Sequence, residues 1–144
     1  MKCPFCNLGE MQGRVIFKND LVFVIPTNIP IVPGHVLVCP LRHVQKIEEL
    51  TPEEHKALFL AAEKIKQALE NVFQAEGYNF AWNEGGVAGQ SVPHFHLHIL
   101  PRKAGDTGIT EYEPRKFLYR PGSREASPDS ELEEVTKIIK QYMD

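Results

Sequence analysis

Short apolar runs, each bounded by turn-forming residues, dominate the first forty positions of the chain. The runs at 15–17 and 21–25 are rich in β-branched and aromatic residues and lie close together, so they predict a β-hairpin. Three prolines then impose a loop that ends at Gly34, and the apolar run at 35–40 predicts a third strand. This part of the chain is therefore expected to be mainly β-structure.

A long helix is predicted to follow. Thr51 can cap its first turn, and Glu54, three residues later, completes a capping box. Behind this start, apolar residues recur at helical spacing with charged residues opposite them, and we expect the helix to end at Gly77. The apolar stripe consists of Leu58, Ala61, Ala62, Ile65, Ala68, Leu69, Val72 and Phe73.

Two further strands are predicted at 78–83 and 94–100, and a glycine-rich loop at 85–91 separates them. An irregular stretch follows over roughly 101–127, and a last helix is expected to begin at Ser127-Pro128. Short strands in succession around one central helix predict an α+β fold. The expected architecture is an antiparallel five-stranded sheet with one long helix packed on it and a C-terminal helix.

Composition and length limit the class of protein. The 144 residues are 42% hydrophobic and 24% charged, which is typical of a globular protein. We expect a single domain over residues 1–144, with its core in about 1–106 and a flap and the last helix in 107–144. The net charge of −3 gives no indication of nucleic acid or an anionic membrane as a partner. No apolar run approaches the roughly 20 residues that cross a bilayer, and no apolar signal segment opens the chain, so we expect a cytoplasmic protein.

Half of the chain's six histidines lie within five residues. Because side chains alternate between the faces of a strand, His94, His96 and His98 are expected to share one face, and the apolar residues between them the other. Core packing explains the apolar set but not three imidazoles in a row. Two chemical interpretations compete: imidazoles on a strand can bind a metal ion, or one imidazole can act as a nucleophile that its neighbours orient.

The loop before these histidines favours the second interpretation. Residues 85–91 are small, flexible and rich in backbone N–H groups, and Gln90 and Ser91 add side-chain donors. Such a loop can surround phosphate oxygens, although a glycine-rich loop on its own also makes plain turns. Next to three histidines, the loop favours catalysis on a phosphate-bearing substrate.

The segment 89–100 contains the sequence HFHLHIL. It resembles the signature of the histidine triad superfamily, in which three histidines alternate with apolar residues. The segments 32–42 and 100–106 resemble those of the fragile histidine triad branch, the dinucleoside polyphosphate hydrolases. The resemblance covers roughly residues 1–106. It implies a nucleotide hydrolase that cleaves dinucleoside polyphosphates at the α-phosphate through a nucleotidyl-histidine intermediate.

The resemblance also implies a role for each histidine of the site. His96 would attack the α-phosphorus, and the backbone at His94 would orient the ring of His96. His98 would donate to a non-bridging phosphate oxygen, and His35 would support His98 from behind. Water would then release the nucleoside monophosphate.

Further residues are implied to bind the substrate. Gln90 and Ser91 would hold the bridging oxygen and the leaving group, and Asn83 would bind the α-phosphate or the ribose. Several relatives place an Asp or Asn where it reaches the ribose hydroxyls, and that position is Thr27 here, with Asn28 beside it. Ribose binding is therefore expected to be weaker, or to depend on Asn28.

The same histidines suit related chemistries. One alternative is a nucleoside phosphoramidase, which breaks a P–N bond, and another is a phosphorylase or nucleotidyl transferase, in which another group attacks the intermediate. A nucleotide-sensing or partner-binding protein with negligible turnover is the alternative outside enzymes, and the intact triad argues against it. The resemblance further implies a homodimer, formed by joining two sheets and packing the long helices.

The N-terminal Cys3-Pro4-Phe5-Cys6 is by itself at most half of a zinc site, and two buried thiols are the simpler alternative. A redox motif would need a βαβ pattern, which the sequence lacks. Histidine triad proteins with this motif, and the related galactose phosphate uridylyltransferase, bind zinc, so the resemblance implies the ligands Cys3, Cys6, His43 and His94. Four nitrogen and sulfur ligands make a closed tetrahedral site, so the zinc would be structural.

The stretch 109–125 interleaves basic and aromatic side chains. Bases stack on aromatic rings and arginines bind phosphates, so one hypothesis is that it contacts the distal part of a polyphosphate substrate. A surface flap with solvated charges is the favoured alternative.

Overall fold

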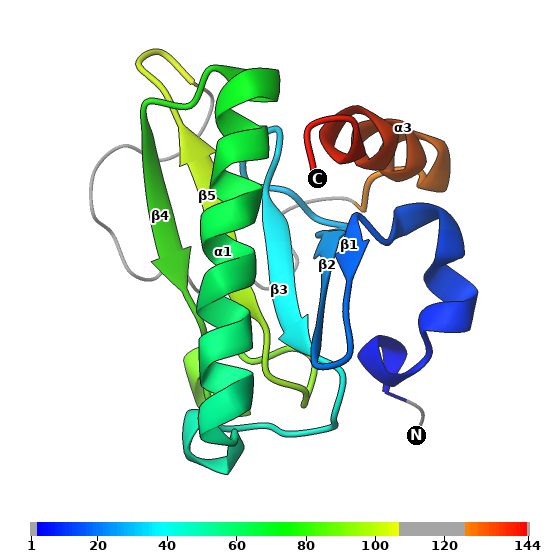
Figure 1. Ribbon diagram of the computed structural model, residues 1–144, viewed down its shortest axis with the longest axis vertical. Coiled ribbons are helices and arrows are strands. Elements are labelled where there is room, and N and C mark those ends of the chain that lie inside the picture. The colour runs from blue at the N-terminus through cyan, green and yellow to red at the C-terminus, as the bar shows by residue number, and fades with distance from the viewer. Residues whose placement is uncertain (1–2, 107–125, 144) are drawn as a thin grey trace.

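The computed structural model describes residues 3–106 and 126–143 and has the predicted α+β architecture (Figure 1). Its strands are β1 (Phe17–Lys18), β2 (Val22–Pro26), β3 (Val36–Pro40), β4 (Gly77–Ala81) and β5 (Leu97–Arg102). Its helices are α1 (Pro52–Phe73) and α3 (Asp129–Lys140), and its 3-10 turns are η1 (Pro4–Cys6), η2 (Leu8–Arg14), η3 (Ile47–Glu49) and η4 (Gly86–Ala88).

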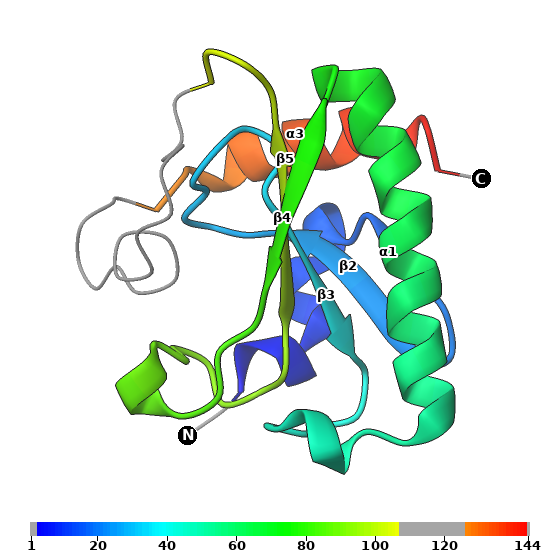
Figure 2. The same ribbon diagram turned by 90° about the vertical axis from the view of Figure 1, so that its left-hand side faces the viewer.

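The strands form one antiparallel sheet in the order β1-β2-β3-β5-β4. Figure 2 shows α1 along one face of this sheet, and η1 and η4 on the other side. The apolar stripe of α1 packs against alternate residues of β2, β3 and β5 and makes the main core. On the opposite face, Phe23, Ile25 and Leu37 pack against Phe5 and Met11 of the N-terminal turns. α3 packs against α1, β2 and η2.

The start of α1 is as predicted, and its end is not. Thr51 Oγ1 accepts from the Glu54 N–H at 3.1 Å and Glu54 Oε1 accepts from the Thr51 N–H at 2.8 Å, which confirms the capping box. The helix ends at Phe73 and not at Gly77, because Gln74 takes a left-handed conformation with φ 54° and ψ 42°. Gly77 instead opens β4.

The histidine-bearing strand begins later than predicted. β5 starts at Leu97, three residues after His94, because the Phe95 N–H donates to the carbonyl of Val44 at 2.6 Å, outside the sheet. The expected alternation nevertheless continues through this lead-in. Phe95 and Leu97 belong to the core under α1, and the ring of His94 lies on the side of the N-terminal turns.

Among the residues that the structure describes, no helix combines the length and the apolar composition needed to cross a bilayer. The stretch 109–125, with its two alternative interpretations, lies outside the described residues. The last helix begins directly after Pro128, as predicted.

Candidate active site

The three clustered histidines lie on the sheet face opposite α1. His94 and His96 are buried, and His98 is partly exposed. The ring of Phe5 stands edge-on to the two buried rings, with centroids 5.8 Å from His94 and 5.2 Å from His96. The ring centroids of His96 and His98 are 5.0 Å apart. The structure thus brings together the three side chains that the sequence pattern placed on one face.

The proton position on His96 follows from its hydrogen bond. Its Nδ1 lies 2.7 Å from the carbonyl oxygen of His94, and because a carbonyl oxygen only accepts, Nδ1 carries the proton. In the neutral ring, Nε2 then has a lone pair. Burial lowers the pKa of His96, which favours this neutral form near pH 7. Such an imidazole can act as a nucleophile.

His35 sets the proton position on His98. The Ile31 N–H donates to His35 Nδ1 at 3.1 Å, so neutral His35 carries its proton on Nε2. His35 Nε2 lies 3.0 Å from His98 Nδ1 and therefore donates to it. His98 must then carry its own proton on Nε2, and this N–H can donate to an anion beside His96.

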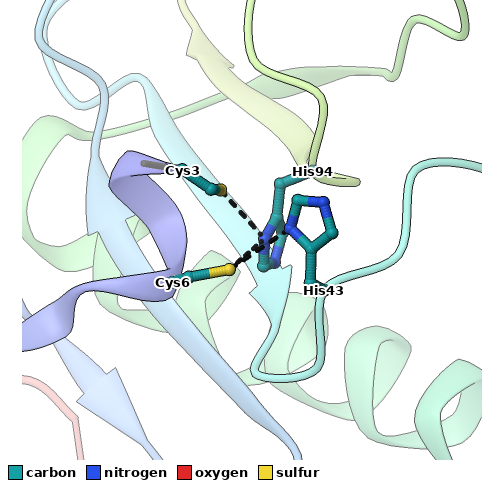
Figure 3. A group of neighbouring side chains, drawn as sticks. All are labelled: Cys3, Cys6, His43 and His94. Atoms are coloured by element: carbon teal, nitrogen blue, oxygen red, sulfur yellow. Dashed lines mark hydrogen bonds between the residues drawn. The ribbon is translucent and has the colours of Figure 1, made fainter. Parts of the chain in front are cut away.

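A second group of side chains surrounds His94. The ligand atoms of Cys3, Cys6, His43 and His94 all lie within 4.8 Å of one another (Figure 3). His94 Nδ1 is 3.4 Å from Cys3 Sγ and 3.5 Å from Cys6 Sγ, and His43 Nδ1 is 3.2 Å from Cys6 Sγ. A tetrahedral zinc ion with ordinary bond lengths holds nitrogen and sulfur ligands about 3.5 Å apart. The group could therefore bind a metal ion.

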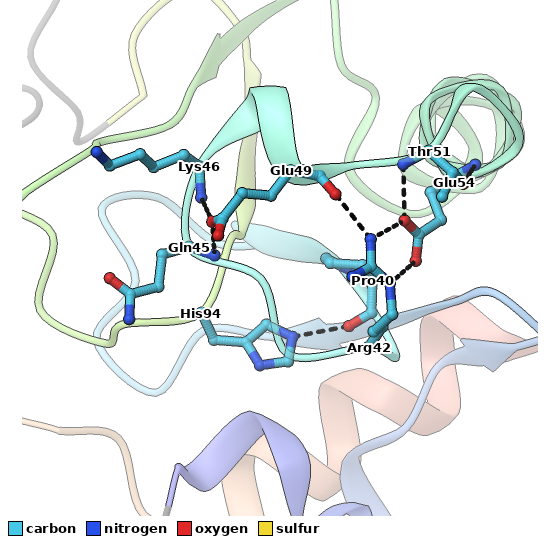
Figure 4. Close-up of polar contacts among 8 residues, drawn as sticks. All are labelled: Pro40, Arg42, Gln45, Lys46, Glu49, Thr51, Glu54 and His94. Carbon is cyan, nitrogen blue, oxygen red and sulfur yellow. Dashed lines mark hydrogen bonds and ion pairs between the residues drawn. The ribbon is translucent and has the colours of Figure 1, made fainter.

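The orientation of the His94 ring supports this. Its Nε2 lies 2.7 Å from the carbonyl oxygen of Pro40, so Nε2 donates (Figure 4). Nδ1 then presents a lone pair toward Cys3 and Cys6 (Figure 3). Burial lowers the pKa of His94, which favours the neutral form that a ligand requires. The ring of His94 thus faces the cysteines, and the backbone carbonyl of His94 faces His96.

The segment that carries His43 is anchored to the start of α1. Arg42 Nη2 donates to Glu54 Oε1 at 2.8 Å and to the carbonyl oxygen of Glu49 at 2.7 Å (Figure 4). The hydrogen bond from this guanidinium lowers the pKa of the Glu54 carboxyl, which is only 4% exposed. The Glu54 carboxylate therefore both caps α1 and holds Arg42, which directly precedes the potential metal ligand His43.

The glycine loop is closed by the side chain of Gln90. Gln90 Oε1 accepts from the Gly85 N–H at 2.8 Å, and Gln90 Nε2 donates to the carbonyl oxygen of Gln45 at 3.3 Å. Gly85 and Gly89 have φ values of 88° and 98°, which favour glycine. The Gln90 amide is thus engaged with backbone groups at both its oxygen and its nitrogen.

The other expected substrate residues differ in their exposure and in their hydrogen bonds. Asn83 Nδ2 donates to the carbonyl oxygen of Gly89 at 3.4 Å, and Ser91 is exposed. Thr27 is buried, and its Oγ1 accepts from the backbone N–H two residues later at 3.4 Å. Asn28 is exposed, and its carbonyl accepts from a backbone N–H just before α3 at 2.7 Å.

Two residues near the site were not singled out from the sequence. Phe5 packs on His94 and His96, and its place between two cysteines was the only available signal. Glu84 Oε2 accepts from the Ile47 N–H at 2.9 Å and from Trp82 Nε1 at 3.1 Å. No sequence pattern identifies the contact between Ile47 and Glu84, because it joins residues 37 positions apart.

Comparison with known proteins gives consistent results. Residues 9–105 match the family model described as HIT domain. The chain is 39% identical over 126 residues to bis(5'-adenosyl)-triphosphatase of Dictyostelium discoideum, which covers 88% of this chain and 80% of that protein. It is 43% identical over 94 residues to asymmetrical bis(5'-nucleosyl)-tetraphosphatase of Schizosaccharomyces pombe, which covers 65% of this chain and only 52% of that protein.

A solved structure of a zinc-bound histidine triad family protein from Mycobacterium smegmatis has the same fold. It superposes with a TM-score of 0.73 at 26% identity, over 99% of this chain and 93% of the other. The HIT domain match spans the whole sheet, α1 and all six histidines. The chain therefore belongs to the HIT domain family.

Proposed function

We propose that the chain is a nucleotide hydrolase that cleaves dinucleoside polyphosphates at the α-phosphate. The observation that carries this proposal is the pair of complementary proton positions on adjacent rings. His96 has a lone pair on Nε2, and His98 has an N–H on Nε2. One group can attack phosphorus while the other stabilises charge on a phosphate oxygen. The triphosphatase and tetraphosphatase named above support the substrate class.

The reaction would proceed in two displacements at phosphorus. In the first, His96 Nε2 bonds to the α-phosphorus, and the bond to the bridging oxygen breaks, so that this oxygen leaves with the electron pair. The His94 carbonyl, which accepts from Nδ1–H, stabilises the positive charge that the ring gains. His98, oriented by His35, donates to a non-bridging oxygen. In the second, a water oxygen bonds to the phosphorus, the P–N bond breaks and returns its electron pair to His96 Nε2, and the nucleoside monophosphate leaves while the water proton passes to solvent.

The remaining site residues would hold the substrate. Backbone N–H groups of residues 85–91, with Ser91, would surround the phosphates, and Gln90 would exchange one of its backbone contacts to reach the bridging oxygen. Asn83 would bind the α-phosphate or the ribose. The Thr27 oxygen already accepts from the backbone, so ribose binding would be weaker or would depend on the exposed Asn28.

Side-by-side kinetics with diadenosine triphosphate and adenosine phosphoramidate test this assignment. We expect kcat/KM to favour the dinucleotide by at least about tenfold, since its second nucleotide adds binding energy in the transition state. The products should be AMP and ADP. Faster cleavage of the phosphoramidate would instead make the chain a phosphoramidase, and a requirement for inorganic phosphate would make it a phosphorylase.

We further propose that Cys3, Cys6, His43 and His94 hold a structural zinc ion. Two sulfur and two nitrogen ligands suit tetrahedral zinc, and the zinc-bound family member from Mycobacterium smegmatis supports this choice. With four protein ligands, such an ion would cross-link the chain and would have no open coordination position for substrate.

We also propose a cytoplasmic location. The three cysteines form no disulfide with one another, which fits a reducing compartment.

We also propose that the chain forms a homodimer through β4 and α1. β4 is an edge strand of the described sheet, and Phe80 on it is 48% exposed. Trp82 just beyond β4, and Phe59 and Leu60 on α1, are also exposed. Large apolar side chains gathered at an open sheet edge indicate an interface.

Light scattering should therefore give twice the chain mass of 16.3 kDa. Phe80→Glu should shift the protein toward the monomer, because a charge at the joined edges is costly to bury. Ile138→Glu on α3 is the matched control, since Ile138 is also exposed and apolar but lies away from β4. A monomeric mass for the unchanged protein would contradict the proposed dimer.

A further inference from the structure

A short segment that follows β3 and ends at the first residue of η3 contacts three separate parts of the candidate site. We call residues 43–47 the clasp segment. The Val44 carbonyl accepts from the Phe95 N–H at 2.6 Å, just ahead of β5. The Gln45 carbonyl accepts from Gln90 Nε2 at 3.3 Å, at the end of the glycine loop. The Ile47 N–H donates to Glu84 Oε2 at 2.9 Å, at the start of that loop.

The metal site and the clasp segment share the same backbone. His43 is the first residue of the segment and directly precedes Val44, and His94 directly precedes Phe95. A metal bound by both histidines would therefore tie together the two stretches that the Val44–Phe95 hydrogen bond already joins. Gln45, which holds the Gln90 amide, is two residues from His43. Order at the metal site should thus extend to the glycine loop.

The clasp segment is held from its other side as well. The N–H groups of Gln45 and Lys46 donate to Glu49 Oε1 at 2.9 Å and 2.8 Å (Figure 4). The Glu84 carboxylate connects the end of the clasp segment, at Ile47, to the residues that directly precede the glycine loop. Glu84 Oε2 also accepts from Trp82 Nε1 at 3.1 Å, so one carboxylate oxygen holds both the residue that follows β4 and the clasp segment.

We propose that Glu84 is a positioning residue that couples the metal site to the glycine loop through the clasp segment. Its effect on the reaction rests on the proposed function, in which the loop binds phosphates. The coupling itself is a property of the fold. Because coupling between two sites is reciprocal, loosening the clasp at Glu84 should weaken metal retention, and removing the metal should loosen the loop.

Metal retention tests the first half of this coupling. Glu84→Ala removes the acceptor, and the rate at which zinc passes to a chromogenic chelator should rise about tenfold, as for other residues that support ligands indirectly. Glu84→Gln keeps an acceptor oxygen for both N–H groups, so its rate should stay within about twofold of the unchanged protein. Glu134→Ala, at an exposed position on α3, should have no effect.

Loop order and kinetics test the second half. In the zinc-loaded unchanged protein, amide hydrogen exchange at 85–90 should be slower than in Glu84→Ala and slower than in the chelated protein, while α3 exchanges alike in all three. KM for diadenosine triphosphate should rise about fivefold in Glu84→Ala with kcat within about twofold, and Glu84→Gln should restore it.

The proposal is overturned if Glu84→Ala releases zinc at the rate of the unchanged protein, or if exchange at 85–90 does not respond to metal removal. The exchange comparison on the unchanged protein needs no variant, so an absent response to metal removal would overturn the coupling even if Glu84→Ala fails to fold. Metal release and exchange also remain decisive if no dinucleotide is cleaved, because that result contradicts the proposed function and not the coupling.

Discussion

His96→Ala is expected to lower hydrolysis of diadenosine triphosphate by at least roughly a thousandfold, because it removes the nitrogen that is proposed to form the bond to phosphorus. His98 cannot replace it, since His35 donates to His98 Nδ1 and leaves a proton on His98 Nε2. The loss should appear in kcat, with KM little changed, because the loop and not His96 binds most of the phosphate chain. Steady-state assays of AMP release measure both constants.

The fold should survive this substitution. His96 is buried on the sheet face opposite α1, so its removal leaves the packing under α1 intact and takes away only the ring that Phe5 packs against. His96→Gln keeps a side chain of similar reach and should be equally inactive, which separates lost chemistry from lost packing. His55→Ala, at the start of α1, is a histidine control that should retain full activity. Full hydrolysis by either His96 variant would contradict the proposed nucleophile.

Local patterns carried most of the fold prediction. The capping box at Thr51 and the apolar stripe behind it located α1, because both depend on neighbours within one or two helical turns. The end of the helix was missed, since the left-handed conformation that closes it is taken by Gln74, a residue type without that preference. The alternation around His96 correctly indicated the shared face, even though β5 starts only at Leu97.

The chemistry of the site depended on contacts that no local pattern specifies. His35 and His98 are 63 residues apart, and only the pairing of β3 with β5 brings them within 3.0 Å. The proton positions on the histidine rings follow from backbone groups of Ile31, His94 and Pro40, and a sequence pattern does not predict where those groups lie. The resemblance to a known family supplied the roles, and the geometry supplies a physical reason for them.

Removal of the metal should cause the largest single decrease in the free energy of unfolding. η1 is only three residues long and buries only Phe5, so the metal would be the main attachment of Cys3 and Cys6 to His43 and His94. We expect Cys6→Ala to lower the free energy of unfolding by about 3–5 kcal/mol. For a domain of this size, that corresponds to a fall in Tm of about 10 °C or more. Thermal unfolding followed by circular dichroism measures the change.

Chelation distinguishes the metal contribution from ordinary packing. A strong chelator should lower the Tm of the unchanged protein, and added zinc should restore it, because a ligand that binds only the folded state stabilises it by mass action. Cys6→Ala should no longer respond to either treatment. Cys39→Ala, which truncates a fully buried thiol outside the metal cluster, should be destabilised by its cavity yet respond to chelation normally. If elemental analysis finds far less than one zinc per chain, or if chelation leaves Tm unchanged, the four residues do not form a structural zinc site, and the N-terminal turn is held by the apolar packing of Phe5 and its neighbours.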